Sequence, residues 1–337
     1  MTVSFVIPTW NRSDLLAAAL ASIRAQTVPA LEILVVDNGS TDDSARVAAA
    51  AGARVIPLGV NRGFSFAVNR GLEAARGDAV AVVNNDVEFH PAWTEKLGCA
   101  MQRGGGWFAI GKLLDYAQRD RIDGVGDAIC RGGTSWRLGH GRADGPLFDQ
   151  PRPTFFPSAT ALLARREWFD RVGKLEEAFF TYLEDVDLGL RAALLGLPGV
   201  YVPEAVAWHR GSSTLGRWSA TTVERITRNQ ILLLAKYYPM TLLVRFWLPI
   251  LTAQALWGAL AARHNCILAY THGLVAGLWG SRRIRRSAAA WRENGNRLAP
   301  ILGASESELA RLQQATGWDH YWRWYFRLAP SSPGVRG

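Results

Sequence analysis

The sequence predicts an α/β fold in which a mostly parallel sheet is flanked by helices. Short apolar runs rich in Val, Ile and Phe alternate with helical patterns through the first part of the chain. Such alternation is typical of parallel strands joined by covering helices. Three of these runs end in polar clusters, and ligands of parallel sheets bind beyond the carboxyl ends of the strands. We therefore expect a ligand site at that edge.

The expected elements follow in order from the N-terminus. The run Val3–Pro8 predicts a buried strand, and Ser13 is expected to cap the helix after it, whose apolar residues recur at helical spacing. Further strands are expected over residues 31–36, 54–58, 79–83, 155–164 and 200–206, and helices over 66–75, 166–172, 186–195 and 221–238. The Gly-rich residues 104–155 are expected to form a long loop region with a few strands, lying over the site.

Charge divides the chain into two expected domains, residues 1–230 and 231–337. The net charge of +9 falls entirely in the second, which also holds half of the 14 tryptophans. A basic, Trp-rich, partly apolar region favours an anionic membrane surface as partner. No zinc-finger, RNP or basic-helix pattern supports binding to nucleic acid.

Two interpretations of the C-terminal apolar helical region remain open. Residues 242–260 and 266–280 are apolar stretches, but the first contains Arg245 and Pro249 and the second is short and precedes a cluster of arginines. This pattern favours helices lying in the membrane interface over a simple span. The alternative is a helical subdomain packed on the first domain. The three cysteines form no zinc or disulfide pattern, and the N-terminus has no secretion signal, so we expect a cytoplasmic protein.

Two segments carry residues suited to chemistry. Asp86 follows a buried strand, and a divalent cation on a diphosphate needs only one or two oxygen ligands from the protein. In the segment 178–191, Asp187 precedes Arg191 by four residues and suits an ion pair, which leaves Glu184 or Asp185 as a general base. The alternatives are an Asp86 that caps a turn and carboxylates that only cap or pair.

Five segments in this order resemble the family 2 glycosyltransferases with a GT-A fold. They are VSFVIPTWNR, ILVVDNGSTDDS, NRGFSFAVNRGLEAARGD, VVNNDVEF and FFTYLEDVDLGLRAALLG, and the resemblance covers roughly residues 3–215. It implies an inverting, metal-dependent enzyme that uses a nucleotide sugar and requires Mn²⁺ or Mg²⁺.

The resemblance also implies roles for particular residues. Asp185, beside Glu184, matches the catalytic base, while Asp86 and His209 match metal ligands. His209 also has a purely structural interpretation, as a hydrogen-bonded residue after a strand. The expected contacts with the nucleotide sugar come from Pro8, Thr9, Asn11, Arg12, Asp37, Asn38, Arg62, Gly63, Asn69, Asn84 and Asn85.

By the same resemblance, the expected reaction moves a sugar to a glycan or polyprenyl-linked acceptor at the inner face of the cell membrane. Rhamnose from a dTDP donor is the first expectation. Two alternatives stand beside it. A sugar nucleotidyltransferase would need a Gly-rich phosphate loop after the first strand, where the chain reads PTWNRSD. A non-catalytic sugar-nucleotide-binding or scaffold protein is favoured only by Asn84, which stands where the family's motif begins with Asp.

Overall fold

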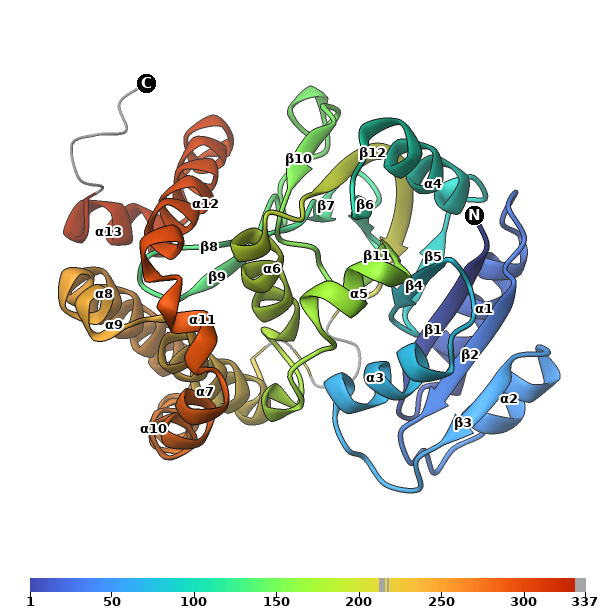
Figure 1. Cartoon of the computed structure of the whole chain (residues 1–337), viewed down its shortest axis with the longest axis horizontal. Coiled ribbons are helices and arrows are strands. Elements are labelled where there is room, and N and C mark those ends of the chain that lie inside the picture. Colours follow the sequence, from blue (N-terminus) through green and yellow to red (C-terminus); the bar gives the residue numbers. More distant parts are fainter. Residues whose placement is uncertain (212–215, 217, 331–337) are drawn as a thin grey trace. The chain divides into compact units, whose positions relative to one another are not determined.

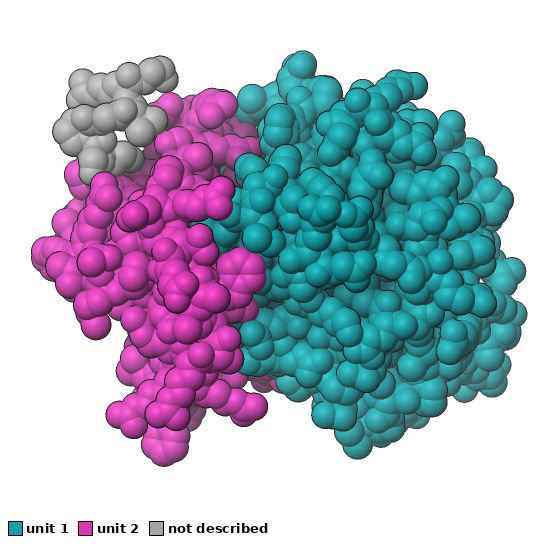
Figure 2. Space-filling model, viewed as in Figure 1, with its two compact units in different colours: residues 1–127, 139–214 teal, residues 128–138, 215–337 magenta. Residues whose placement is uncertain are grey.

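A computed structural model describes residues 1–211, 216 and 218–330. Contacts between residues divide the chain into two compact units, residues 1–127 with 139–214 and residues 128–138 with 215–337 (Figure 2). The domain boundary expected at residue 230 lies inside helix α7 (Ala220–Tyr237). A short segment from the middle of the chain, residues 128–138, thus groups with the C-terminal helices.

The first unit is a sheet with helices on both of its faces (Figure 1). Its elements are β1 (Val3–Thr9), α1 (Ser13–Arg24), β2 (Glu32–Asp37), α2 (Ser44–Ala50), β3 (Arg54–Pro57), α3 (Phe64–Ala74), β4 (Ala79–Val83), β5 (Val87–Phe89), α4 (Trp93–Gly104), β6 (Phe108–Asp115), β7 (Ile122–Gly124), β10 (Arg152–Thr154), β11 (Ala161–Arg165), α5 (Arg166–Val172), α6 (Glu184–Leu195) and β12 (Gly199–His209), with 3₁₀ turns at Pro146–Phe148 and Glu177–Phe179.

The predicted α/β sheet flanked by helices is confirmed, and its strands run in mixed directions. The main order is β10-β12-β6-β11-β4-β1-β2-β3, with β5 pairing with β12 and β7 with β6. The strands β4, β1, β2 and β3 are parallel, as the sequence predicted. Strand β11 is antiparallel to both of its neighbours, β4 and β6. The parallel part matters most for function because it brings three strand ends to one edge.

Helices cover both faces of β1, which explains why all of its residues are buried. On one face, Phe5 and Ile7 belong to a core that includes residues of α1 and α4, among them Trp93. On the other face, Gly71 of α3 lies against Val6, where a β-carbon would approach a Val6 methyl group. The first strand is therefore fixed from both sides, and the turn that follows it has a rigid base.

The described part of the second unit is helical apart from one two-stranded ribbon. Its elements are β8 (Asp127–Ile129, which begins at the end of the first unit's segment), β9 (Ser135–Arg137), α7, α8 (Met240–Arg245), α9 (Trp247–Arg263), α10 (Ile267–Ser287), α11 (Ala289–Glu293), α12 (Gly295–Thr316) and α13 (His320–Leu328).

A buried ion pair and a glycine contact hold this second unit together. Arg131 contacts Glu306 of α12 through its guanidinium at 2.8 Å, and both side chains are nearly buried. This pair attaches the ribbon to the C-terminal helices. Helix α10 packs on α7 at Gly273, where a β-carbon would come within 2.5 Å of the Glu224 carbonyl oxygen. The expected C-terminal helical region is confirmed, but no helix in the described residues is both long and apolar enough to cross a bilayer.

Candidate active site

The carboxyl ends of β1, β2 and β4 meet at one edge of the sheet. Thr9 and Asp37, the last residues of β1 and β2, are partners in the parallel register. The side-chain amide of Asn85, two residues beyond β4, donates a hydrogen bond to Thr9 Oγ1 at 2.8 Å. The structure therefore brings together three of the residues that the sequence placed in a nucleotide site. Pro8 lies inside β1 and is buried.

The turn after β1 has an unusual backbone. Asn11 and Arg12 both have positive φ, 59° and 65°, a conformation that residues other than glycine adopt at a cost. The hydroxyl of Ser40 accepts a hydrogen bond from the Asn11 N–H, and Asn11 Oδ1 accepts one from the Thr41 N–H. Arg12 is the N-cap residue of α1, so the expectation that Ser13 caps this helix is wrong. The Arg12 guanidinium pairs with Asp14.

Asn38 holds the next loop, residues 61–63, against this edge. Its side-chain oxygen accepts a hydrogen bond from the Arg62 N–H at 2.8 Å, and its amide donates to the Gly63 carbonyl at 3.3 Å. Gly63 has φ +91°, and a β-carbon there would lie 2.6 Å from the Phe180 ring. Glycine is thus required both for the backbone conformation and for the approach of Phe180.

Two other expected nucleotide contacts are already engaged with the protein. The guanidinium of Arg62 lies 3.9 Å from the centre of the Phe66 ring. Asn69 is buried in α3, where its amide donates to the Leu175 carbonyl and to Glu177 and its oxygen accepts from the Leu175 N–H. The structure therefore places Asn69 as a support for the segment at 175–177.

Asp86 and His209 lie side by side, as the metal site predicted from the sequence requires. Asp86 directly precedes β5, and His209, the last residue of β12, pairs with Val87 of β5. His209 Nε2 lies 3.3 Å from Asp86 Oδ1, and both side chains are buried. Asn84 lies two residues before Asp86 in the sequence. Its side-chain oxygen is buried and has no hydrogen-bond partner in the described structure.

These residues fit a divalent cation that takes most of its ligands from a substrate. Within the described residues, no three His, Cys, Asp or Glu side chains form a complete metal cluster. A cation bound to a diphosphate needs only one or two carboxylates, and Mn²⁺ accepts imidazole as well as oxygen. Asp86 and His209 supply that reduced set, and the unpartnered oxygen of Asn84 is a further acceptor in the same motif.

Asp123 completes this group and was missed by the sequence analysis. It lies in β7, is buried, and its Oδ2 is 2.8 Å from His209 Nδ1. Burial opposes the charged form of the imidazole, but the hydrogen bonds and charges of Asp123 and Asp86 outweigh it and raise the pKa of His209 to about 9. No local signal marks Asp123, because it lies in the Gly-rich region and reaches His209 only through strand pairing.

The second group of expected catalytic residues begins helix α6. The predicted ion pair is confirmed, since Arg191 lies 2.9 Å from Asp187 and both side chains are buried. The helix starts at Glu184, so Glu184 and Asp185 lie in its first turn and do not precede it as expected. Anions are stabilised at this end of a helix by the unpaired N–H groups and the helix dipole.

Glu184 and Asp185 have different environments. Burial and the negative charge of Asp185 raise the pKa of Glu184 well above its usual value. One carboxyl oxygen of Glu184, Oε2, is buried without a hydrogen-bond partner. Asp185 is partly exposed, and its Oδ2 accepts a hydrogen bond from the Ala159 N–H at 3.2 Å. Of the two, Asp185 is therefore the carboxylate able to meet a substrate.

The segment before α6 is conformationally strained. Phe180, Tyr182 and Leu183 all have positive φ although none is glycine. Such residues persist only where the surrounding structure determines their conformation, and they cluster at functional sites. Here the Phe180 carbonyl accepts a hydrogen bond from the Ser65 N–H at 3.2 Å, which connects this segment to the loop containing Gly63.

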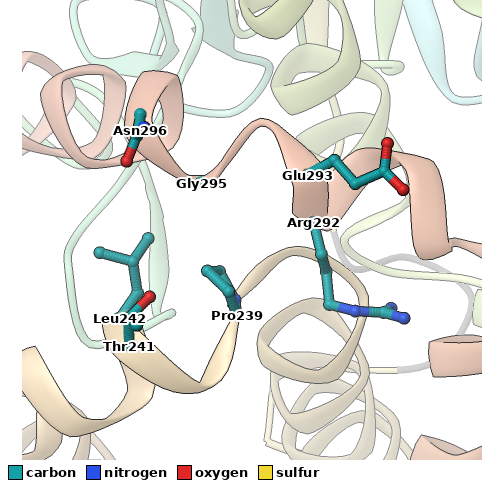
Figure 3. Close-up of a pocket in the computed structure, with 7 residues that line it drawn as sticks. All are labelled: Pro239, Thr241, Leu242, Arg292, Glu293, Gly295 and Asn296. Atoms are coloured by element: carbon teal, nitrogen blue, oxygen red, sulfur yellow. The ribbon is translucent and has the colours of Figure 1, made fainter.

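Two surface hollows of the second unit contain none of the expected site residues. One is lined by Pro239, Thr241 and Leu242 of the α7–α8 region and by Arg292, Glu293, Gly295 and Asn296 at the junction of α11 and α12 (Figure 3). A second is lined by His272, Val275, Ala276 and Trp279 of α10. The candidate active site is thus defined by its side chains, at the edge of the sheet.

The fold and this edge define an α/β protein with polar side chains gathered at the carboxyl ends of parallel strands, and comparison with known proteins identifies the family. The model of glycosyl transferase family 2 matches residues 4–173, about half of the chain, and the chain belongs to this family. It is 33% identical over 240 residues to the N-acetylglucosaminyl-diphospho-decaprenol L-rhamnosyltransferase of Mycobacterium tuberculosis, an alignment covering 63% of this chain and 77% of that relative.

Two further comparisons agree. The O-antigen biosynthesis protein RfbC of Myxococcus xanthus is 30% identical over 222 residues, which covers 63% of this chain and 17% of that protein. A crystal structure of GalNAc-T7 with UDP, GalNAc and Mn²⁺ superposes with a TM-score of 0.59 at 14% identity, covering 83% of this chain and 57% of that chain. The protein is therefore a glycosyltransferase with a GT-A fold.

Proposed function

We propose that this glycosyltransferase moves a sugar from a nucleoside diphosphate donor to a hydroxyl group of a glycan or polyprenyl-linked acceptor, with inversion at the anomeric carbon. The observation that carries the proposal is a short segment, Ala159 and Thr160, that connects Asp185 with the motif beginning at Asn84. The Thr160 carbonyl accepts a hydrogen bond from the Asn84 N–H at 2.9 Å, and the neighbouring Ala159 N–H donates to Asp185. The proposed base Asp185 and the candidate metal motif are thus hydrogen-bonded to two adjacent residues of the same segment.

Asp185 is the proposed general base. Its carboxylate takes the proton of the acceptor hydroxyl as the acceptor oxygen bonds to the anomeric carbon, and the bond to the diphosphate breaks with its electron pair leaving on the diphosphate. Helix α6 and the Ala159 N–H hold the carboxylate in its charged form and in position. Burial and the charge of Asp185 raise the pKa of Glu184, so Glu184 is the less readily ionised carboxyl of the two.

The donor is proposed to lie along the edge built by Thr9, Asp37 and Asn85. The turn at Asn11 and the loop at Arg62 and Gly63 bound this edge. Ser40 holds the turn and Asn38 holds the loop. A nucleotide could use the exposed Arg62 and the unpartnered oxygen of Asn84. Mn²⁺ or Mg²⁺ held by Asp86 and His209 would stabilise the charge on the departing diphosphate.

The relatives support a choice of substrates. The mycobacterial relative is named for rhamnosyl transfer to N-acetylglucosaminyl-diphospho-decaprenol, a lipid-linked saccharide. We therefore propose rhamnose, from its dTDP derivative, as the sugar and a polyprenyl diphosphate saccharide as the acceptor. The competing proposal of a non-catalytic binding protein requires that Asp185 carry no function, which its exposure and fixed position in α6 disfavour.

A lipid-linked acceptor makes a membrane surface the proposed partner of the second unit, at the cytoplasmic face of the cell membrane. One face of α10 exposes large apolar side chains at helical spacing, with Trp279 85% exposed. These side chains are Leu268, Val275, Leu278 and Trp279. Arg282, Arg283 and Arg286 follow them and are also exposed. Tryptophan favours the headgroup level, and arginines are attracted to anionic lipids.

Two experiments test these proposals. A thermal-shift screen of nucleoside diphosphates should give stabilisation only with Mn²⁺ or Mg²⁺ present, by ~2.7 kcal/mol at 100 times the dissociation constant. No stabilisation by any nucleoside diphosphate with either metal would contradict the donor proposal. For the membrane, sedimentation with vesicles of anionic and of zwitterionic lipid should show binding to the anionic vesicles, weakened by salt. Equal pelleting at all salt concentrations, or none at all, would contradict an interfacial contact.

A further inference from the structure

Asp123 has no role in the expected chemistry, yet it makes the shortest polar contact of the proposed metal ligand His209. Its Oδ2 lies 2.8 Å from His209 Nδ1, whereas Asp86 Oδ1 lies 3.3 Å from Nε2 on the other side of the ring. The three side chains are all buried. The imidazole is therefore held between two carboxylates, one at each nitrogen.

The backbone around Asp123 is shaped to direct this side chain. Strand β7 pairs with β6 through Leu113–Gly124 and Leu114–Ile122, so the register slips by one residue and Asp123 is the residue left over. Extra residues of this kind form β-bulges, which turn a side chain to a new direction and often lie beside active sites. The Asp123 carbonyl oxygen also lies 3.0 Å from His140 Nδ1, which gives the bulge a second attachment.

The chemistry of imidazole gives this contact a consequence. A histidine binds a metal through a nitrogen that carries no proton, and the hydrogen bond at the other nitrogen decides which nitrogen that is. A carboxylate at Nδ1 keeps a proton there, so a cation that binds the ring does so at Nε2 and displaces the proton from that nitrogen. The carboxylate also fixes the plane of the ring. Outer carboxylates of this type are common behind metal-binding histidines, and their loss typically costs metal affinity.

We propose that Asp123 is a positioning residue that holds His209 with Nε2 directed to the Asp86 side, ready to bind the divalent cation. This proposal rests on the proposed function in that it needs a cation at Asp86 and His209. It adds a residue that lies outside the motifs recognisable in the sequence. Asp123 contacts neither the cation nor the substrate and acts only through the ring of His209.

The first test measures Mn²⁺ binding by calorimetry, with and without dTDP, in the absence of sugar donor and acceptor. Asp123→Ala should weaken Mn²⁺ binding by about 10–100-fold. Asp123→Asn keeps an oxygen that can accept from Nδ1 but removes the charge, and we expect an intermediate loss. Glu88→Gln is the matched control, because Glu88 is a carboxylate on the neighbouring strand β5 that pairs with Arg210 and is not bonded to His209. Its affinity should equal that of the wild type.

The second test is made on the metal-free protein and involves no activity. With ¹⁵N-labelled histidine, the spectrum of the six histidines should contain a slowly exchanging Nδ1–H signal that His209→Gln removes. Asp123→Ala should remove it as well, and Glu88→Gln should leave it. Asp123→Asn should keep it at a changed shift, so this variant decides the question if Asp123→Ala does not fold.

The outcomes separate this proposal from the proposed function. If the wild type binds Mn²⁺ and Asp86→Ala does not, while Asp123→Ala binds as tightly as the wild type, the role of Asp123 is overturned and the metal site stands. The same holds if Asp123→Asn changes neither the affinity nor the His209 signal. If the wild type binds no Mn²⁺ or Mg²⁺, with or without dTDP, the metal site and the role of Asp123 are overturned together.

Discussion

The Ala159 N–H donates a hydrogen bond to Asp185 Oδ2 at 3.2 Å, and this contact fixes the proposed base relative to the loop of Asn84. The same short segment bonds to that loop through Thr160. A backbone donor also stabilises the ionised carboxylate, which is the form that can accept a proton. General-base catalysis by Asp185 therefore requires that its carboxylate be charged, held in position and accessible at the same time.

Asp185→Asn should remove transfer and leave nucleotide binding nearly unchanged. The amide cannot accept the proton of the acceptor hydroxyl, and loss of a general base typically costs about 10²–10⁴-fold in rate. Turnover and nucleotide affinity should be measured on the same preparation. Turnover within tenfold of the wild type would remove Asp185 from this role.

Asp86→Ala should lose metal binding and metal-dependent donor binding together. Asn84 and Asn85 supply no charge, so Asp86 is the anionic member of its motif. A direct ligand should matter more than an outer partner, so we expect a loss of Mn²⁺ affinity above about 100-fold. Calorimetric titration with Mn²⁺ checks this, with Glu88→Gln as control. Unchanged affinity in Asp86→Ala would place the cation elsewhere.

Gly63→Ala should destabilise the protein and weaken nucleotide binding. The residue has φ +91° and would place its β-carbon 2.6 Å from the Phe180 ring. Strained backbone alone costs about 1–3 kcal/mol. Gly59 offers a matched control, since its φ is +76° but nothing lies within 4 Å of a β-carbon there. Chemical denaturation should show a larger loss of unfolding free energy for Gly63→Ala than for Gly59→Ala. Equal losses would show that the Phe180 contact is unimportant.

Glu184→Gln should stabilise the protein at neutral pH. The pKa of Glu184 is raised in the folded state by burial and by Asp185, so the folded chain keeps a proton that the unfolded chain releases above about pH 4.5. The stabilisation from the neutral carboxyl is complete below that pH and is lost as pH rises through the folded pKa. Glutamine stays neutral, so thermal unfolding should favour the variant at pH 7 and show little difference at pH 4. The exposed Glu167→Gln is the control, and a variant no more stable than the wild type at pH 7 would contradict the buried neutral state.

The arginines beyond the apolar face of α10 should matter for membrane binding, with one exception. Arg285 is half-buried and donates to the Tyr238 carbonyl at 3.2 Å, so its replacement would disturb helix packing. Replacing Arg282, Arg283 and Arg286 by Ser should weaken binding to anionic vesicles. The matched control replaces three exposed arginines of other helices, Arg263, Arg311 and Arg323. If both triple variants lose binding equally, the effect is one of net charge and not of this face.

The sequence predicted the parts of the fold that are local. Apolar runs and the polar clusters after them located the parallel strands, and the spacing of Asp187 and Arg191 predicted their ion pair. The antiparallel insertion of β11 was not predicted, because strand direction is set by long-range pairing.

The parts that were missed depend on contacts between distant segments. Asp123 reaches His209 across two strand pairings, and no spacing in its own Gly-rich segment marks it. The grouping of residues 128–138 with the C-terminal helices depends on the pairing of Arg131 with Glu306, 175 positions apart. The start of α6 at Glu184 was also missed, because the strained residues before it give no periodic signal.

The most direct test of the central claim is transfer itself. The protein with Mn²⁺, dTDP-rhamnose and a polyprenyl diphosphate N-acetylglucosamine acceptor should give a rhamnosylated lipid and free dTDP, with inversion at the anomeric carbon. Chelation of the metal and Asp185→Asn should each abolish the product. A panel of other nucleotide sugars, run in parallel, tests the choice of donor separately from the reaction type. Undiminished transfer by Asp185→Asn, or transfer that persists without any divalent cation, would contradict the account.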